Sequence, residues 1–131
     1  MTGTFARIDA NVNTLVEDGR VRGVFIQTED MKNSFLNYPD FVCLDATHKL
    51  TNKPLSLMVF LSENAIGKGE VAAVALLASE NAKTFEWLLN AFKENNIEGS
   101  TKIRCFMADK DIKERNKLKE TFPGAPVYIC R

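Results

Sequence analysis

Two aspartates follow apolar runs and are the residues best placed to do chemistry. Asp45 comes directly after the run 41–44, and Asp109 comes after the run 103–108. A carboxylate in such a position risks losing its water shell, so it needs a cation or hydrogen-bond donors nearby. If the two runs are neighbouring strands, the pair suits Mg²⁺ or Mn²⁺, which prefer oxygen ligands. The alternative is structural, because Asp109 or Asp111 can instead cap the helix that follows.

Neighbouring strands are needed to hold these aspartates side by side. The sequence from residue 41 onward predicts such strands. Apolar runs bounded by turn residues indicate five strands, which begin near residues 41, 55, 71, 103 and 127. A helix capped by Ser79 or Asn81 follows the third strand, with Phe85, Leu88 and Phe92 on its apolar stripe. A charged helix over residues 111–121 follows the fourth strand.

This order of elements leaves few topologies. Short connections make the first three strands an antiparallel meander, and right-handed helical crossovers add the last two. The simplest sheet has the order 3-2-1-4-5, in which the first and fourth strands are neighbours. We therefore expect an α/β fold with a mixed five-stranded sheet and packed helices, with Asp45 beside Asp109.

Residues 1–40 read as an N-terminal preamble to a core that spans residues 41–131. Apolar residues at near-helical spacing predict a helix within residues 1–20, ending at Asp18-Gly19. A short strand over residues 21–27 and a helix from Thr28 to Asn37 complete the preamble.

Composition narrows the class of protein. With 131 residues, 45% of them hydrophobic, the chain can bury one core and is too short for two ordinary domains. Seventeen basic residues balance seventeen acidic ones, so the whole chain has no net field that attracts nucleic acid or a membrane. Cys43, Cys105 and Cys130 are dispersed in apolar runs and predict reduced thiols in an intracellular protein without a membrane span.

Three segments carry a resemblance to a known family. They are DATHKLT (45 to 51), VAAVALLASENAKTFEWLLNAFK (71 to 93) and FMADKDIKERNKLKETFPGAPVYIC (106 to 130). Together they resemble the RNase H-like transposase domain of Mutator-like elements, and most of all its relatives in SWIM zinc-finger domain-containing proteins. The resemblance covers about residues 24 to 131. It implies an RNase H-like fold and a DDE acidic triad that binds two metal ions, with Asp45 and Asp109 as its first two members.

The chain also departs from that family. The third acidic residue is expected on a helix after the fifth strand, and the family's cysteine matching Cys130 begins a C-x-x-H pair; neither feature occurs before Arg131. We therefore expect a piece of a longer protein that ends before the C-terminal helix. Such a chain should bind Mg²⁺ or Mn²⁺ weakly and catalyse nothing alone. Zinc is expected outside it, because His48 is its single histidine.

Other charged residues have ordinary structural explanations beside functional ones. Lys110, Lys113 and Lys117 lie in a helix with a local positive excess and are candidates for DNA phosphate contacts, although a mixed-charge exposed face explains them too. His48 and Lys49 could assist at the aspartates or simply end a strand in solvent.

Two further positions are weighed in the same way. Glu80 precedes the long helix and is interpreted as a favourable charge at its N-terminus, although it could stand near the aspartates. Trp87 lies off the apolar stripe, where we expect core packing rather than a partner surface.

The resemblance thus implies part of a domesticated transposase-like domain in a nuclear SWIM zinc-finger-type protein, with ancestral metal-dependent DNA cleavage and strand transfer. The alternative is a non-catalytic scaffold for protein partners or DNA. In either case DNA contacts would come mainly through the longer protein.

Overall fold

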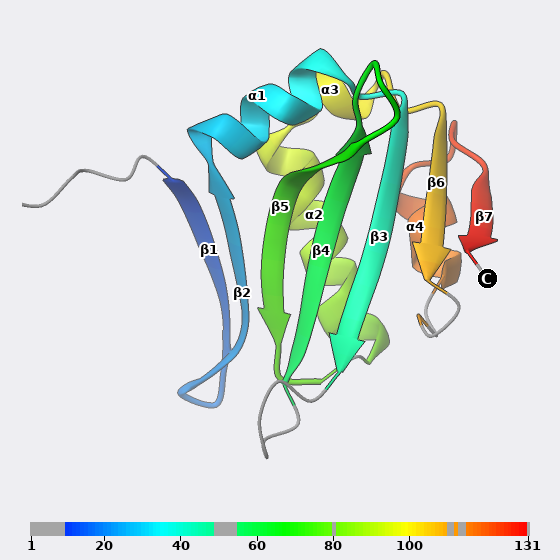
Figure 1. The fold of residues 1–131 in the computed structure, drawn as a ribbon. Coiled ribbons are helices and arrows are strands. Elements are labelled where there is room, and N and C mark those ends of the chain that lie inside the picture. Colours follow the sequence, from blue (N-terminus) through cyan, green and yellow to red (C-terminus); the bar gives the residue numbers. More distant parts are fainter. Residues whose placement is uncertain (1–9, 49–54, 80, 110–111, 113–114, 131) are drawn as a thin grey trace, which may run out of the picture.

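The strands of this chain form one mixed sheet (Figure 1). The computed structural model describes residues 10–48, 55–79, 81–109, 112 and 115–130. Seven strands occur in these ranges, in the order β1-β2-β5-β4-β3-β6-β7 across the sheet. Their bounds are β1 Ala10–Glu17, β2 Arg20–Thr28, β3 Phe41–His48, β4 Ser56–Glu63, β5 Gly69–Leu77, β6 Cys105–Asp109 and β7 Val127–Cys130.

The five strands predicted from the sequence lie in the predicted order. The run β5-β4-β3-β6-β7 is antiparallel from β5 to β3 and parallel from β3 to β7, as a meander followed by helical crossovers requires. The predicted count of five strands is wrong, because β1 and β2 extend the same sheet beyond β5. The expected α/β class with a mixed sheet and packed helices is confirmed.

The predicted helix within residues 1–20 is wrong over its described part, because Ala10–Glu17 is strand β1. Asp18 and Gly19 both have positive φ, 53° and 72°, and join β1 to β2 in a tight hairpin. Two such residues in succession match the type I′ turn that favours an Asp-Gly pair. The dipeptide that we interpreted as the end of a helix therefore reverses the chain between two strands.

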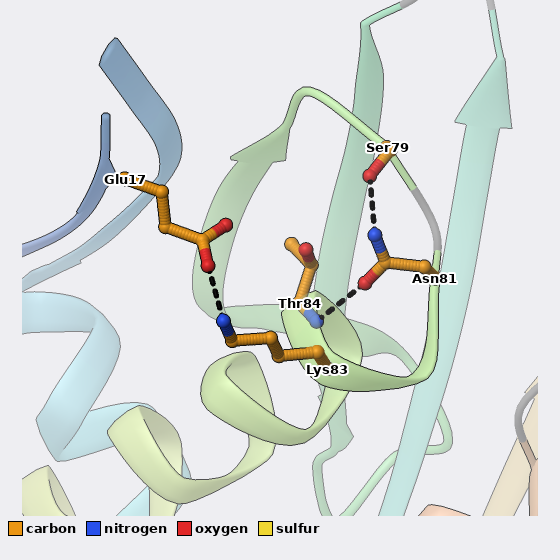
Figure 2. A network of polar contacts seen from close by, with 5 residues as sticks. All are labelled: Glu17, Ser79, Asn81, Lys83 and Thr84. Atoms are coloured by element: carbon orange, nitrogen blue, oxygen red, sulfur yellow. Dashed lines mark hydrogen bonds and ion pairs between the residues drawn. The ribbon is translucent and has the colours of Figure 1, made fainter. Parts of the chain in front are cut away.

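The described helices are α1 Glu29–Asn37, α2 Ala82–Asn95, α3 Ile97–Ser100 and α4 Arg115–Thr121. Thr28 caps α1, since its Oγ1 accepts a hydrogen bond from Met31 N at 3.2 Å. Asn81 caps α2, since its Oδ1 accepts from Thr84 N at 2.8 Å (Figure 2). Both caps fall where the sequence predicted them, and α4 confirms the described part of the predicted charged helix.

Figure 2 also shows how α2 is tied to the β1–β2 hairpin. Lys83, in the first turn of α2, forms an ion pair with Glu17 at the end of β1. Next to it, the Ser79 hydroxyl accepts a hydrogen bond from Asn81 Nδ2 at 3.0 Å, which orients the capping side chain. Both interactions are exposed, so they fix orientation more than they add stability.

The core lies between one face of the sheet and the helices. Phe92 of α2 is fully buried and stacks on Phe60 of β4, with ring centroids 4.3 Å apart. Phe35 brings α1 into the same layer, 5.0 Å from Phe92. It also lies so close to Gly99 of α3 that a Cβ there would be 2.5 Å from its ring. The predicted burial of Phe92 at the junction of helix and sheet is confirmed.

The other face of the sheet has no described helix on it. In β3, Val42, Leu44 and Ala46 are buried on the helix side, so the alternating residues 41, 43 and 45 face the opposite way. Exposed Met107 and Tyr128, which pair with each other between β6 and β7, lie on that same face. We call it the open face, defined by Phe41, Cys43, Asp45, Met107, Asp109 and Tyr128.

Candidate metal centre on the open face

Asp45 and Asp109 lie next to each other on the neighbouring parallel strands β3 and β6. The β3–β6 register pairs Leu44 with Ala108, so the next residue along each strand brings the two aspartates together. Asp45 is exposed and Asp109 is half-buried. Both belong to the open face because their neighbours Leu44, Ala46 and Ala108 are buried against the helices.

The two carboxyl groups interact directly. The pKa of Asp45 lies above its ordinary value of 3.8, chiefly because its side chain hydrogen-bonds to Asp109. Partial burial and the negative charge of Asp109 raise the pKa further, while the backbone N–H of Ala46 lowers it. A hydrogen bond between two carboxyl groups requires a proton on one of them, so the protonation of Asp45 depends on its neighbour Asp109.

Such a pair has the donor chemistry of a hard-cation site. Two adjacent carboxylates repel each other unless a proton or a cation lies between them, and oxygen donors suit Mg²⁺ and Mn²⁺. Among the described residues, no group of three or more His, Cys, Asp or Glu side chains is arranged to hold a metal ion. The described donors therefore fit a divalent ion in part, with two ligands and the remaining positions left to water or other groups.

The surroundings of the pair are apolar on one side. Val59 of β4 pairs with Asp45, and Val74 of β5 pairs with Val59, so the row continues across the open face as aliphatic side chains. Lys49, Glu80, Lys110 and Lys113 lie outside the described residues, as does the side chain of His48. Their proposed roles near the aspartates or DNA remain predictions.

Lys117 is engaged with acidic side chains. Its Nζ lies 2.9 Å from Glu86 Oε2 and 3.2 Å from Glu120 Oε2, and these hydrogen bonds raise its pKa. A phosphate would therefore have to compete with two carboxylates for this ammonium group. The predicted DNA contact at Lys117 stays a prediction.

Trp87 packs where the sequence interpretation expected core. Its ring covers Gly23 of β2 so closely that a Cβ on Gly23 would be 2.8 Å from Trp87 Cζ3. The residue is partly buried against the core cluster. The absence of a side chain at Gly23 thus lets α2 approach the sheet.

Sequence reasoning missed a groove on the helix side of the molecule. It has a volume of about 540 Å³ and lies between the C-terminal end of α2, α3 and the segment 121–125. Two stretches of the chain build it, residues 90–103 and 121–125, and the local signal in the sequence was the apolar Ile97 beside a polar helix end.

Similarity to known proteins shows the family of this chain. Residues 2–128 match the family model of the RNase H-like domain of zinc finger SWIM domain-containing proteins 1 and 3. The chain belongs to this family. The match spans both the β1–β2 hairpin and the strands that carry Asp45 and Asp109, so the hairpin is part of the RNase H-like domain of this chain. The resemblance stated from the sequence motifs is confirmed.

A plant protein shows the same similarity. The chain is 27% identical over 120 residues to the protein FAR-RED IMPAIRED RESPONSE 1 of Arabidopsis thaliana. The alignment covers 92% of this chain and 14% of that protein's length. The chain thus matches one short region of a much larger relative. In the described part of the chain, no helix is long and apolar enough to cross a membrane.

Proposed function

We propose that Asp45 and Asp109 together bind one divalent cation, Mg²⁺ or Mn²⁺, in a domain whose ancestral activity is metal-dependent DNA cleavage and strand transfer. The observation that carries the proposal is the position of the two aspartates side by side on the paired strands β3 and β6. The raised pKa of Asp45 beside Asp109 agrees with it. Membership of a SWIM-type RNase H-like family supports it. Bound cations of this kind supply charge neutralisation and an activated water in phosphodiester chemistry.

In this proposal, a proton and the cation compete for the two carboxyl groups. Without a cation, the pair retains a proton to a higher pH than a lone aspartate does, because Asp109 lies beside Asp45. Cation binding requires both carboxylates to be ionised, so it should release that proton and tighten as pH rises. The rigid parallel pairing of β3 and β6 holds the two ligands in place before binding.

We further propose that this 131-residue chain alone does not cleave DNA. Two carboxylates leave most coordination positions to water, so a scissile phosphate and a nucleophile would not be held in line. Catalysis in the nucleus would then require further acidic ligands and DNA contacts from a longer protein. Zinc binding, by the same proposal, belongs to a part of that protein outside this chain.

Thermal melting and a cleavage assay test these statements together. Millimolar Mg²⁺ should raise the melting temperature of the native chain by a few degrees, because the ion binds only the folded state. Asp45→Asn should lose most of that increase, whereas Asp40→Asn removes one exposed charge elsewhere and should keep it. An equal increase in all three proteins would refute the site, and Mg²⁺-dependent nicking of plasmid DNA would refute the inactivity.

A second candidate function is a non-catalytic scaffold for protein or DNA partners. The groove on the helix side favours this role, because it is separate from the aspartates and no described segment fills it. In that case Asp45→Asn should leave the biological activity of the longer protein intact. A loss of activity would favour the metal-dependent role.

A further inference from the structure

The groove on the helix side has the anatomy of a small protein interface. Its floor is apolar, since Ile103, Phe122 and Ala125 are nearly fully buried, while Ile97 stands 72% exposed at its wall. Polar residues Asn90 and Thr101 also line it. An apolar centre surrounded by polar groups is the usual composition of a protein–protein contact, and the volume of about 540 Å³ admits at least one large side chain.

A cation is fixed at the same place. Lys93 Nζ donates a hydrogen bond to the carbonyl oxygen of Thr121 at 2.9 Å and lies 5.8 Å from the centre of the Phe122 ring. In the described part of the chain, no carboxylate forms an ion pair with Lys93, unlike Lys83 and Lys117. Its ammonium group is therefore held over the groove, and it has further N–H donors besides the one bonded to Thr121.

A buried hydroxyl in the groove wall also lacks a partner. Ser100 ends α3, and its Oγ makes no hydrogen bond among the described residues although it is shielded from solvent. Buried polar atoms in native proteins are nearly always satisfied, so this one needs explanation. Because Ser100 lines the groove, a backbone group of a bound segment would be a suitable partner for this hydroxyl.

We propose that the groove binds a short segment of a protein partner that carries a large apolar residue close to an acidic one. The apolar side chain packs against Ile97 and Phe122, and the carboxylate pairs with Lys93. Glu94 also lines the groove, but the contacts of Lys93 hold the positive charge over its floor. The inference rests on the scaffold role alone, so the metal-site proposal can fail without affecting it.

Selection from a library of short random phage-displayed peptides tests this inference on the whole chain. We expect the enriched peptides to contain a Leu, Phe or Trp within a few positions of an Asp or Glu. A synthetic peptide of the enriched sequence should bind about tenfold more weakly to Ile97→Asp. Ile66→Asp is the matched control, because Ile66 is equally exposed, at 77%, in the turn between β4 and β5.

Variants that change charge distinguish the ionic contribution of Lys93 from the apolar contribution of Ile97. Lys93→Gln should weaken binding several-fold and flatten its dependence on salt, whereas Glu94→Gln should not weaken it. Denaturant melts of each variant exclude unfolding as the cause. The inference is overturned if no peptide is enriched, if the peptides lack acidic residues, or if Ile97→Asp and Ile66→Asp bind them equally.

Discussion

At the scale of single residues, the aspartate pair places two like charges next to each other, which is unfavourable for folding. Asp45 and Asp109 project from adjacent parallel strands, so like charges meet where the sheet is otherwise apolar. A pair of asparagines or aliphatic residues would fit the open face without repulsion. Strand geometry explains why the two side chains meet, and the cation site that we propose would give both carboxylates a role.

This conflict predicts that Asp45→Asn stabilises the chain at neutral pH in the absence of divalent ions. The pKa of Asp45 is raised in the folded state, so the favourable protonated form is fully present below the unfolded value near 3.8 and is lost as pH rises through the folded value. The gain should stay below about 1 kcal/mol, because solvent screens the pair.

Urea unfolding as a function of pH checks this prediction. The difference between Asp45→Asn and the native chain should be near zero at pH 3 and grow as pH rises toward 7. Asp40→Asn, which removes an exposed charge just before β3, serves as the control. A destabilising effect of Asp45→Asn at pH 7 would mean that the two carboxyl groups do not repel each other.

At the scale of elements, α2 is the helix that organises the core on the helix side of the sheet. Its apolar stripe places Phe92 against Phe60 of β4, Phe35 of α1 and Phe122, so one ring joins three elements and a loop. A buried hydrogen bond from Gln27 Nε2 to Asn96 Oδ1, 2.9 Å long, fixes the end of the same helix to β2. The aspartates thus sit on strands whose rear side is rigidly packed.

Phe92→Ala should therefore lower the free energy of unfolding by about 3–5 kcal/mol, because it leaves a large cavity at a junction that cannot collapse. Phe41→Ala is the matched control: Phe41 is 49% exposed on the open face, and its loss should cost less than about 1 kcal/mol. Urea melts measure both. Equal costs for the two variants would contradict the assignment of the core to the helix side.

At the scale of the whole molecule, the order of the five predicted strands followed from the apolar runs in the sequence and the right-handed crossover rule. The apolar runs before Asp45 and Asp109, together with right-handed crossovers, were enough to place β3 beside β6. The interaction of the two carboxyl groups follows from that topology. None of these steps needs knowledge of side-chain packing.

The helix predicted within residues 1–20 was wrong over its described part because the same apolar residues fit both a helical and a strand spacing. In β1, Val12, Leu15 and Val16 fit a helical spacing, but Val12, Thr14 and Val16 also alternate as a strand requires. The Asp18-Gly19 turn decides between them only together with its partner strand. The positions of the open face and the groove also depend on which face of the sheet the helices pack against. Packing across the whole chain determines that face, so local sequence patterns do not predict it.

The balanced charge of the whole chain predicts weak DNA binding. Seventeen positive and seventeen negative residues leave no net field, and Lys117 is already paired with Glu86 and Glu120. Fluorescence anisotropy with a DNA duplex should show affinity no tighter than micromolar at physiological salt and a shallow salt dependence. Nanomolar binding would reveal a basic surface beyond the residues considered.

The central claim is that Asp45 and Asp109 form one divalent-cation site on the open face, and paramagnetic broadening by Mn²⁺ tests it most directly. Substoichiometric Mn²⁺ should broaden the backbone amide signals of Asp45, Ala46 and Asp109 first, and excess Mg²⁺ should restore them. Asp45→Asn should remove most of the effect, whereas Asp40→Asn should not. Broadening centred elsewhere, for example on the acidic first turn of α1, or unchanged in Asp45→Asn, would contradict the account.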